Sequence, residues 1–377
     1  MIESIAKQVS LPALLLDLDA FDANCKTIAA KANGKKIRIA TKSIRSVAVL
    51  ERILKSDATY EGLMCYSPQE AIFLVQKGFD NLLLGYPCWD KDVLREIAVL
   101  TRQGKTIICM VDAVEHIELL ESLANETNGK FLVCIDVDMS TTFPILHFGV
   151  RRSPLKDEMA VLTLAEKIKA TARVELKGLM GYEAQIAGVG DAVPSQSLKN
   201  RLIQYLKKKS RQEIEQRRNR IVRALNDAGY SLDFVNGGGT GSLHTTTRED
   251  VVTEVTVGSG FYSPLLFDYY CHFQYEPSLF FALPVVRKPG PGMYTCLGGG
   301  YIASGPHGSD KVPRPVYPPD GELTSLEGAG EVQTPVFFKQ AQLNIGDPII
   351  FRHAKAGEIC ERFNNIIAFR GSEIVER

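Results

Sequence analysis

The chain has 377 residues, of which 45% are hydrophobic and 23% are charged, the balance of an ordinary globular protein with a sizeable core. Lysine plus arginine and aspartate plus glutamate both number 44, so the formal net charge is zero and no polyanionic partner such as a nucleic acid is favoured. None of the eight cysteines forms a Cys-x-x-Cys pair, which predicts buried free thiols in a reducing compartment.

The N-terminus carries no basic segment followed by an apolar one, as a secretory signal would. No apolar stretch approaches the ~20 residues that are needed to cross a bilayer. We therefore expect a soluble, cytoplasmic protein without a membrane partner.

Over roughly the first 260 residues, short β-branched runs alternate with amphipathic segments. Pro68 indicates the start of a helix, and Gly78, Gly104 and Gly229 indicate helix ends. The predicted helices cover residues 68–77, 90–103, 113–127 and 198–228. The predicted strands are residues 37–41, 63–67, 82–85, 106–112, 131–136, 176–182, 232–236 and 251–257. This alternation predicts a (β/α)8 TIM barrel, with an open doubly wound sheet as the alternative.

A basic run extends from Lys207 to Arg220 within the last predicted helix. Glu213 and Glu215 interrupt the run, so we interpret it as the solvated face of a long helix. After about residue 270 proline and glycine become frequent, and short strand-like runs at 279–286, 335–338 and 348–352 lack long helices between them. This change predicts a second, mostly antiparallel β domain.

Lys42 ends the first predicted barrel strand, where catalytic groups of barrels lie. Partial desolvation at the barrel mouth favours the neutral amine, which can attack an aldehyde to form a Schiff base. A single lysine at a strand end is more often structural, so this residue needs support from elsewhere in the chain.

Two glycine clusters follow the seventh and eighth predicted strands, where barrels often bind phosphate. Their glycines allow backbone N–H groups to approach a phosphate, and their hydroxyl groups add donors. The candidate phosphate-binding residues are Gly238, Gly239 and Thr240 in the first cluster and Gly258, Ser259, Gly260 and Tyr262 in the second. Each cluster alone is explained by a tight turn, but a strand-one lysine with both clusters is the layout that pyridoxal phosphate (PLP) requires.

Residues 11–24, Leu-Pro-Ala-Leu-Leu-Leu-Asp-Leu-Asp-Ala-Phe-Asp-Ala-Asn, resemble the opening of the alanine-racemase-type, fold type III PLP proteins. Residues 38–45, Arg-Ile-Ala-Thr-Lys-Ser-Ile-Arg, are similar to the cofactor-lysine segment of the D-threonine aldolase and D-serine dehydratase branch. The resemblance extends over the whole chain. It implies PLP on Lys42, a barrel over residues 20–265, a β domain formed by 266–377 with 1–19, and a homodimer.

The same resemblance assigns further roles. It makes Tyr182 the neighbour of the PLP ring and Gln185 a polar contact, although Tyr182 is also explained as a core aromatic residue. His147 stands where the family often has an arginine, so a proton-transfer role, a contact to PLP and a structural role all stay open. Arg151 or Arg152 is a candidate for binding a substrate carboxylate through a bidentate pair, with a surface role as the alternative.

Relatives in this branch usually carry a divalent metal on a His-x-Cys or His-x-Asp pair near the C-terminus. Here His353 is followed by Lys355, and a protonated lysine repels a cation. We therefore predict no metal and give His353 and Lys355 a role in binding substrate.

These features predict a PLP-dependent lyase that acts on a D-amino acid, one that is 3-hydroxylated, by aldol cleavage or dehydration. A racemase of the same fold is the first alternative, with Tyr182, His147 or a residue from a partner subunit as the second acid–base group. A non-enzymatic PLP-binding protein is the second alternative, and the large β domain argues against it.

Overall fold

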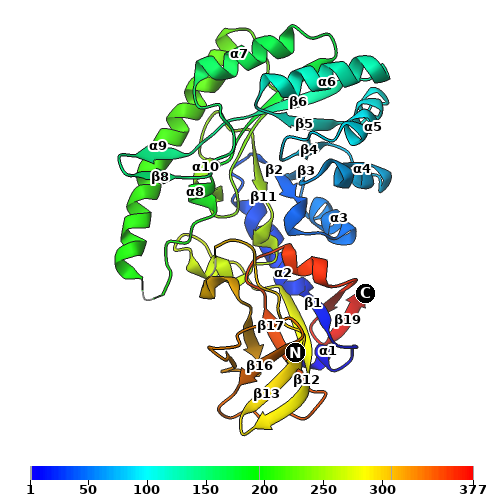
Figure 1. The fold of residues 1–377 in the computed structure, drawn as a ribbon, viewed down its shortest axis with the longest axis vertical. Coiled ribbons are helices and arrows are strands. Elements are labelled where there is room, and N and C mark those ends of the chain that lie inside the picture. Colours follow the sequence, from blue (N-terminus) through cyan, green and yellow to red (C-terminus); the bar gives the residue numbers. More distant parts are fainter. Residues whose placement is uncertain (1, 195, 307, 377) are drawn as a thin grey trace.

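The structure, a computed structural model, describes residues 2–194, 196–306 and 308–376. Eight parallel strands close into a barrel in the order β10-β11-β2-β3-β4-β5-β6-β9 (Figure 1). All eight predicted barrel strands are confirmed, and the open-sheet alternative is excluded. The strands are β2 (Lys36–Ala40), β3 (Tyr60–Cys65), β4 (Leu82–Leu84), β5 (Ile107–Val111), β6 (Phe131–Asp136), β9 (Val174–Gly181), β10 (Phe234–Gly237) and β11 (Glu254–Val257).

Helices surround the barrel, and their ends follow local capping rules. Ser67 accepts a hydrogen bond from the N–H of Glu70 before α4, and Asp157 accepts one from Ala160 at the start of α7. Gly78 and Gly104 follow helices with φ of +91° and +96°, which suits glycine. The helices are α1 (Ile2–Ala6), α2 (Leu18–Ala30), α3 (Val47–Ser56), α4 (Pro68–Gln76), α5 (Lys91–Arg102), α6 (Val114–Thr127), α7 (Glu158–Lys169), α8 (Ala184–Ala187), α9 (Ser197–Asp227) and α10 (Leu243–Thr246).

The 31-residue helix α9 runs along the outside of the barrel from α7 past a small hairpin (Figure 1). The hairpin consists of β7 (Thr141–Phe143) and β8 (Leu146–Phe148), which the sequence did not reveal. The basic run within α9 is only partly solvated, because Lys207 is 2% exposed and Arg218 is fully buried. Both cations contact buried carboxylates, so the prediction of a solvated face is wrong for these two residues.

The barrel interior combines an apolar layer with one buried ion pair. Apolar side chains from six strands pack together inside, among them Leu83, Met110 and Phe234. Arg38 donates two hydrogen bonds to Glu254, with N···O distances of 2.8 and 3.0 Å, and a third to the carbonyl of Asn81 at 2.9 Å. The guanidinium therefore has acceptors for most of its donors inside the barrel.

A second sheet lies below the barrel in Figure 1 and is mostly antiparallel. The N-terminal strand β1 (Ala13–Asp17) pairs antiparallel with β12 and parallel with β18, so the N-terminus belongs to this sheet, as the resemblance implied. The limits predicted at residues 19/20 and 265/266 stay a prediction. The other strands are β12 (Leu279–Gly290), β13 (Met293–Leu297), β14 (Arg314–Tyr317), β15 (Glu322–Leu323), β16 (Gln333–Phe337), β17 (Pro348–Arg352), β18 (Ile366–Arg370) and β19 (Glu373–Glu376).

The loop after β17 brings this sheet to the barrel mouth. Gly357 has a φ of +91°, and a Cβ there would lie 1.9 Å from the carbonyl oxygen of Lys42. Only glycine allows this approach. Arg352 fixes the base of the loop by an ion pair with Asp268 at 2.8 Å and a hydrogen bond to the carbonyl of Ser263.

All eight cysteines are free, as expected. Within the described part of the chain, no helix is long and apolar enough to span a membrane.

Candidate active site

A cavity of about 310 Å³ opens at the carboxyl ends of the barrel strands. The loop after β17 contributes to its rim, so both sheets build it. Nine of the predicted site residues line the cavity: Lys42, Arg152, Tyr182, Gly238, Gly239, Thr240, Gly258, Ser259 and Lys355. The structure thus brings together most of the residues that were selected from the sequence.

Lys42 enters the cavity from a short 3-10 helix, η1 (Thr41–Ser43), directly after β2. Buried Ile37 and Ile39 anchor the strand, and Nζ of Lys42 donates a hydrogen bond to Oη of Tyr86 at 2.9 Å. The Lys42 side chain is exposed in the open mouth of the barrel. The protein therefore does not by itself desolvate this amine as was expected from the sequence.

The two glycine turns meet side by side at the ends of β10 and β11. The N–H of Gly260 donates to Oγ1 of Thr240 at 3.1 Å, which ties the turns together. A Cβ on Gly258 would lie 2.8 Å from Cβ of Ser43, so the second turn packs against η1. Among the residues that the structure describes, the backbone N–H groups of Thr240 and Ser259 have no acceptor. Free N–H groups on such turns form an anion-binding concavity.

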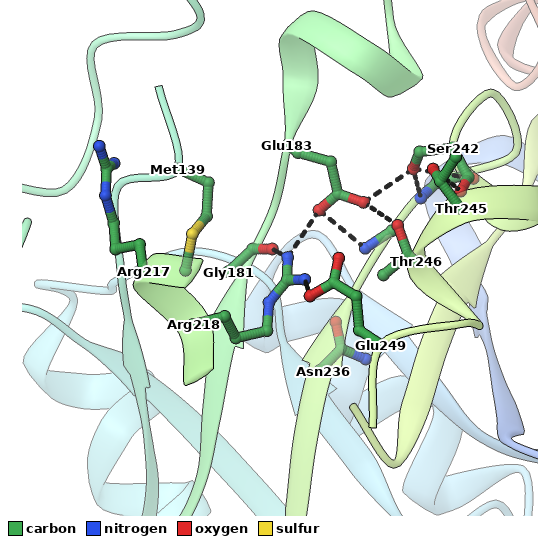
Figure 2. A network of polar contacts seen from close by, with 12 residues as sticks. Met139, Gly181, Glu183, Arg217, Arg218, Asn236, Ser242, Thr245, Thr246 and Glu249 are labelled. Carbon is green, nitrogen blue, oxygen red and sulfur yellow. Dashed lines mark hydrogen bonds and ion pairs between the residues drawn. The ribbon is translucent and has the colours of Figure 1, made fainter. Parts of the chain in front are cut away.

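A buried network of ion pairs and hydrogen bonds contacts the glycine turn that follows β10 (Figure 2). The Glu183 carboxylate accepts hydrogen bonds from the N–H of Gly238 at 3.1 Å and Oγ of Ser242 at 2.9 Å. Arg218 of α9 pairs with this carboxylate at 3.0 Å, pairs with Glu249 as well, and donates to the carbonyl of Gly181 at 2.8 Å. Glu183 and Arg218 therefore hold the turn's backbone in place, and neither was recognised from the sequence.

Polar groups at the ends of β6 and β9 and after β8 also line the cavity. Asp136 ends β6, and burial, followed by the nearby Asp112 carboxylate, raises the pKa of its carboxyl group to about 7. Arg152 lies over the ring of Tyr86, 5.8 Å from its centroid, and forms no ion pair among the described residues. Burial raises the pKa of the Tyr182 hydroxyl to about 12, so this group is protonated at neutral pH.

Five predicted site residues do not line the cavity. Gln185 points away from it, because its amide donates to the carbonyl of Met139 at 2.6 Å and to Ser210 at 3.0 Å. The unforeseen hairpin carries His147, whose Nε2 lies 3.3 Å from the carbonyl of Val150. Tyr262 is fully buried and donates to the carbonyl of Ile44, while Gly260 serves the contact between the turns.

His353 is the fifth of these residues and is only 2% exposed. Its Nδ1 lies 3.1 Å from the carbonyl of Leu279, and its Nε2 is buried without a partner. Burial lowers the pKa of the imidazole to about 3, so the ring is neutral. Lys355, by contrast, faces the cavity rim, with Nζ 3.0 Å from Glu358 and 2.8 Å from Oγ of Ser304.

Away from the cavity, the ligand atoms of Asp191, Cys271 and His272 lie within 4.8 Å of one another, a spacing that a metal ion can bridge. Lys207 places its ammonium group 3.0 Å from the Asp191 carboxylate. Since this cation already neutralises the carboxylate, the cluster is explained as an ion pair at the junction of α9 with the segment around Cys271.

Comparison with known proteins agrees with this geometry. The chain is 26% identical over 254 residues to a 3-hydroxy-D-aspartate aldolase of Paracoccus denitrificans strain Pd 1222, a match that covers 67% of this chain but only 60% of that relative. It is 24% identical over 295 residues to a D-threonine aldolase of an Arthrobacter species, covering 75% and 70% of the two chains.

Solved structures show the same fold. A D-threonine aldolase from Filomicrobium marinum superimposes with a TM-score of 0.82 at 19% identity, covering 98% of this chain and 94% of that one. A D-threo-3-hydroxyaspartate dehydratase from Delftia sp. HT23 gives 0.75 at 17% identity, with 98% and 97% covered. The family model described as alanine racemase, N-terminal domain, matches residues 16–264, and the chain therefore belongs to this family.

Proposed function

We propose that this protein is a PLP-dependent lyase that acts on 3-hydroxylated D-amino acids, by aldol cleavage or dehydration. One observation carries the proposal: the amine of Lys42 shares a cavity with two glycine turns whose backbone N–H groups have no acceptor among the described residues. The names of the relatives support the choice of reaction, since both enzymes act on amino acids of this kind.

The residues of the cavity fit PLP. The phosphate group needs several N–H donors close together, and the turns at Thr240 and Ser259 supply them. The second turn requires glycine at position 258, because a Cβ there would collide with Ser43. The aldehyde group needs a primary amine, which Lys42 provides. When bound, PLP supplies an electron sink for the pair of electrons that is left on the substrate's Cα.

The chain's own residues then orient and move protons. Lys42 would hold the cofactor through its amine, and the same amine, when free, would move a proton at the substrate's Cα. Tyr86 fixes the direction of the Lys42 amine through its 2.9 Å contact. The guanidinium of Arg152 forms no ion pair with any residue that the structure describes, and it suits the substrate's α-carboxylate because the two can form a bidentate pair.

The test combines cofactor mapping with a substrate screen. Borohydride treatment of the purified protein should fix PLP to Lys42, as read by mass spectrometry, and Lys42→Ala should bind no cofactor covalently. D-Threonine and D-3-hydroxyaspartate should then yield an aldehyde or a keto acid, while their L-enantiomers should not. An adduct on another lysine would refute the assignment of Lys42.

The screen also separates the alternatives. Loss of optical activity without an aldehyde or keto acid would identify a racemase, and cofactor binding without any turnover would identify a PLP-binding protein. The homodimer expected from the resemblance stays a prediction, which light scattering at micromolar concentration checks.

A further inference from the structure

The position of Asp136 in the barrel suggests a role in the chemistry. In the closed order of strands, β3, β4 and β5 separate β2 from β6 on one side, and β9, β10 and β11 separate them on the other. The ends of β2 and β6 therefore lie across the mouth from each other. Lys42 follows β2 and Asp136 ends β6, and both line the cavity. A substrate held between the two strands has an amine on one side and a carboxyl group on the other.

The other acidic groups of the cavity are already engaged. Asp138 accepts hydrogen bonds from the N–H and Oγ of Ser140, both at 2.8 Å. Glu358 is held by Lys355 and by Ser304, at 3.0 and 2.6 Å. The Asp136 carboxylate has no hydrogen bond from any described side chain and is contacted by the backbone N–H of Val137, and its charged surroundings are Asp112 beyond β5, Arg152 after the hairpin, and Asp138. It is the cavity carboxylate that is free to exchange a proton with a ligand.

We propose that Asp136 is the catalytic base that removes the proton from the substrate's β-hydroxyl group, on the side of the cavity opposite Lys42. This inference rests on the proposed lyase function.

The proton and electron balance of the aldol cleavage is simple. The Asp136 carboxylate accepts the hydroxyl proton, and the electron pair of the O–H bond forms the carbonyl bond of the aldehyde product. The Cα–Cβ bond breaks, and its electron pair stays on Cα, where Lys42 later delivers a proton. Asp136 then returns its proton to solvent, so the step needs no oxidant or reductant.

The pH dependence gives this role a signature. Burial raises the pKa of Asp136 to about 7, and a base must be deprotonated to act, so kcat/KM for cleavage should rise as the pH increases through this region. The like charge of Asp112 contributes to the elevation. Asp112→Asn should therefore lower the pKa of Asp136 and move the rising limb to lower pH while the plateau is kept. Asp112 does not line the cavity, and its carboxylate lies 3.3 Å from the His116 ring.

The decisive variant is Asp136→Asn, which keeps the shape of the side chain and removes its basicity. Its kcat for cleavage of a 3-hydroxy-D-amino acid should fall by about 10²–10⁴-fold, the usual contribution of a general base. Cofactor absorbance and exchange of the Cα proton of D-alanine with deuterium, followed by NMR, should be unchanged because they depend on Lys42. Asp136→Glu should restore part of the cleavage.

An infrared measurement provides a readout apart from turnover. The carbonyl band of a protonated carboxylic acid should titrate with the same midpoint as kcat/KM and be absent in Asp136→Asn. Cleavage at the wild-type rate in Asp136→Asn, or equal loss of cleavage and Cα exchange, would overturn the role of Asp136 and leave the lyase proposal standing. If Asp136→Asn does not fold, the pH profile of kcat/KM in Asp112→Asn decides. A rising limb at the wild-type pH in that variant would overturn the role of Asp136. Wild-type protein that cleaves no 3-hydroxy-amino acid would instead overturn the lyase proposal itself.

Discussion

The hydroxyl group of Tyr86 lies 2.9 Å from Nζ of Lys42, and the same aromatic ring supports the guanidinium of Arg152 at 5.8 Å. Tyr86 follows β4, two strands away from β2 in the barrel order, so a single side chain connects two parts of the mouth. Its phenol therefore orients the amine that is proposed to hold the cofactor, and its ring orients the cation that is proposed to bind the substrate.

Replacing Tyr86 with phenylalanine tests this connection. The change removes the hydrogen bond to Lys42 but keeps the ring under Arg152, so kcat should fall by about tenfold while KM changes little, as expected for the loss of one hydrogen bond. Steady-state kinetics and the rate of cofactor incorporation measure both effects. Tyr66→Phe is the matched control, because Tyr66 lies near the mouth under Arg45 and does not line the cavity. Equal kinetics for wild type and Tyr86→Phe would contradict the role.

The glycine turns make a second prediction, about cofactor affinity. Gly258→Ala adds a Cβ 2.8 Å from Ser43 and 2.9 Å from Ala40, so the turn must move and its N–H groups lose their position. The dissociation constant for PLP should rise at least about tenfold, or 1.4 kcal/mol. Gly290→Ala, where a Cβ meets nothing within 4 Å, is the control. Fluorescence titration of folded protein measures the affinity, and an unchanged value in Gly258→Ala would argue against this phosphate site.

Two arginines that lie two residues apart on α9, Arg218 and Arg220, predict very different effects on stability. Arg218 is fully buried with Glu183 and Glu249, so Arg218→Met leaves buried carboxylates unpaired and should lower the free energy of unfolding by about 3–5 kcal/mol. Arg220 pairs with Glu158 at the surface, so Arg220→Met should cost less than about 1 kcal/mol. Urea denaturation compares the two variants, and similar losses in both would show that the Arg218 network is not a structural support.

Local rules account for the parts of the fold that the sequence predicted. Short apolar runs predicted the barrel strands, and four amphipathic segments that end at or near a glycine predicted helices between them; such signals need no tertiary information. The same reasoning selected Lys42 and the two glycine turns, since groups at strand ends meet at the mouth of a barrel. Asp136 satisfies this rule equally well as the polar end of a buried strand, although its position in the cavity was not recognised from the sequence.

The remaining features depend on tertiary contacts that one sequence does not encode locally. The β7–β8 hairpin lies between β6 and α7 and carries His147 outside the cavity. Gln185 turns toward Met139 because α8 begins one residue after Glu183, the residue that points to the glycine turn. Lys207 and Arg218 are buried against carboxylates from other segments, Asp191 and Glu183, which no local pattern of α9 reveals.

The buried imidazole of His353 predicts a pH dependence of stability. Burial lowers its pKa to about 3, while in the unfolded chain it titrates near 6.5. As the pH falls below 6.5, the imidazole becomes protonated in the unfolded state but stays neutral in the folded state. The free energy of unfolding should therefore decline by up to about 1.4 kcal/mol per pH unit down to pH 3. His353→Asn, whose amide can keep the contact with Leu279, should flatten this slope.

Denaturation at several pH values measures the slope. His272→Asn is the control, because it removes an exposed histidine in place of the buried one. Asp136 has a raised pKa and acts in the opposite direction, but its contribution is common to all three proteins and cancels in the comparison. Identical slopes for wild type and His353→Asn would show that His353 titrates normally.

The last prediction concerns metal dependence. In the related enzymes a histidine and a residue two positions later were expected to hold the ion, and here those positions are His353 and Lys355. His353 uses Nδ1 on Leu279 and keeps Nε2 buried away from the cavity, while Lys355 brings a cation to the rim. An ammonium group about 4 Å from a divalent ion costs on the order of 8 kcal/mol at an effective dielectric constant of 20.

Chelation by EDTA should therefore leave activity unchanged, and elemental analysis should find no stoichiometric metal that depends on His353. Cys271→Ser is a useful control, because a metal lost in this variant without loss of activity would belong to the separate Asp191, Cys271 and His272 cluster. One zinc or manganese ion per chain that disappears together with activity, both on chelation and in His353→Asn, would establish a metal-dependent reaction. Such an ion would also reassign the β-hydroxyl chemistry, since a metal that binds the hydroxyl lowers its pKa and leaves Asp136 a smaller role.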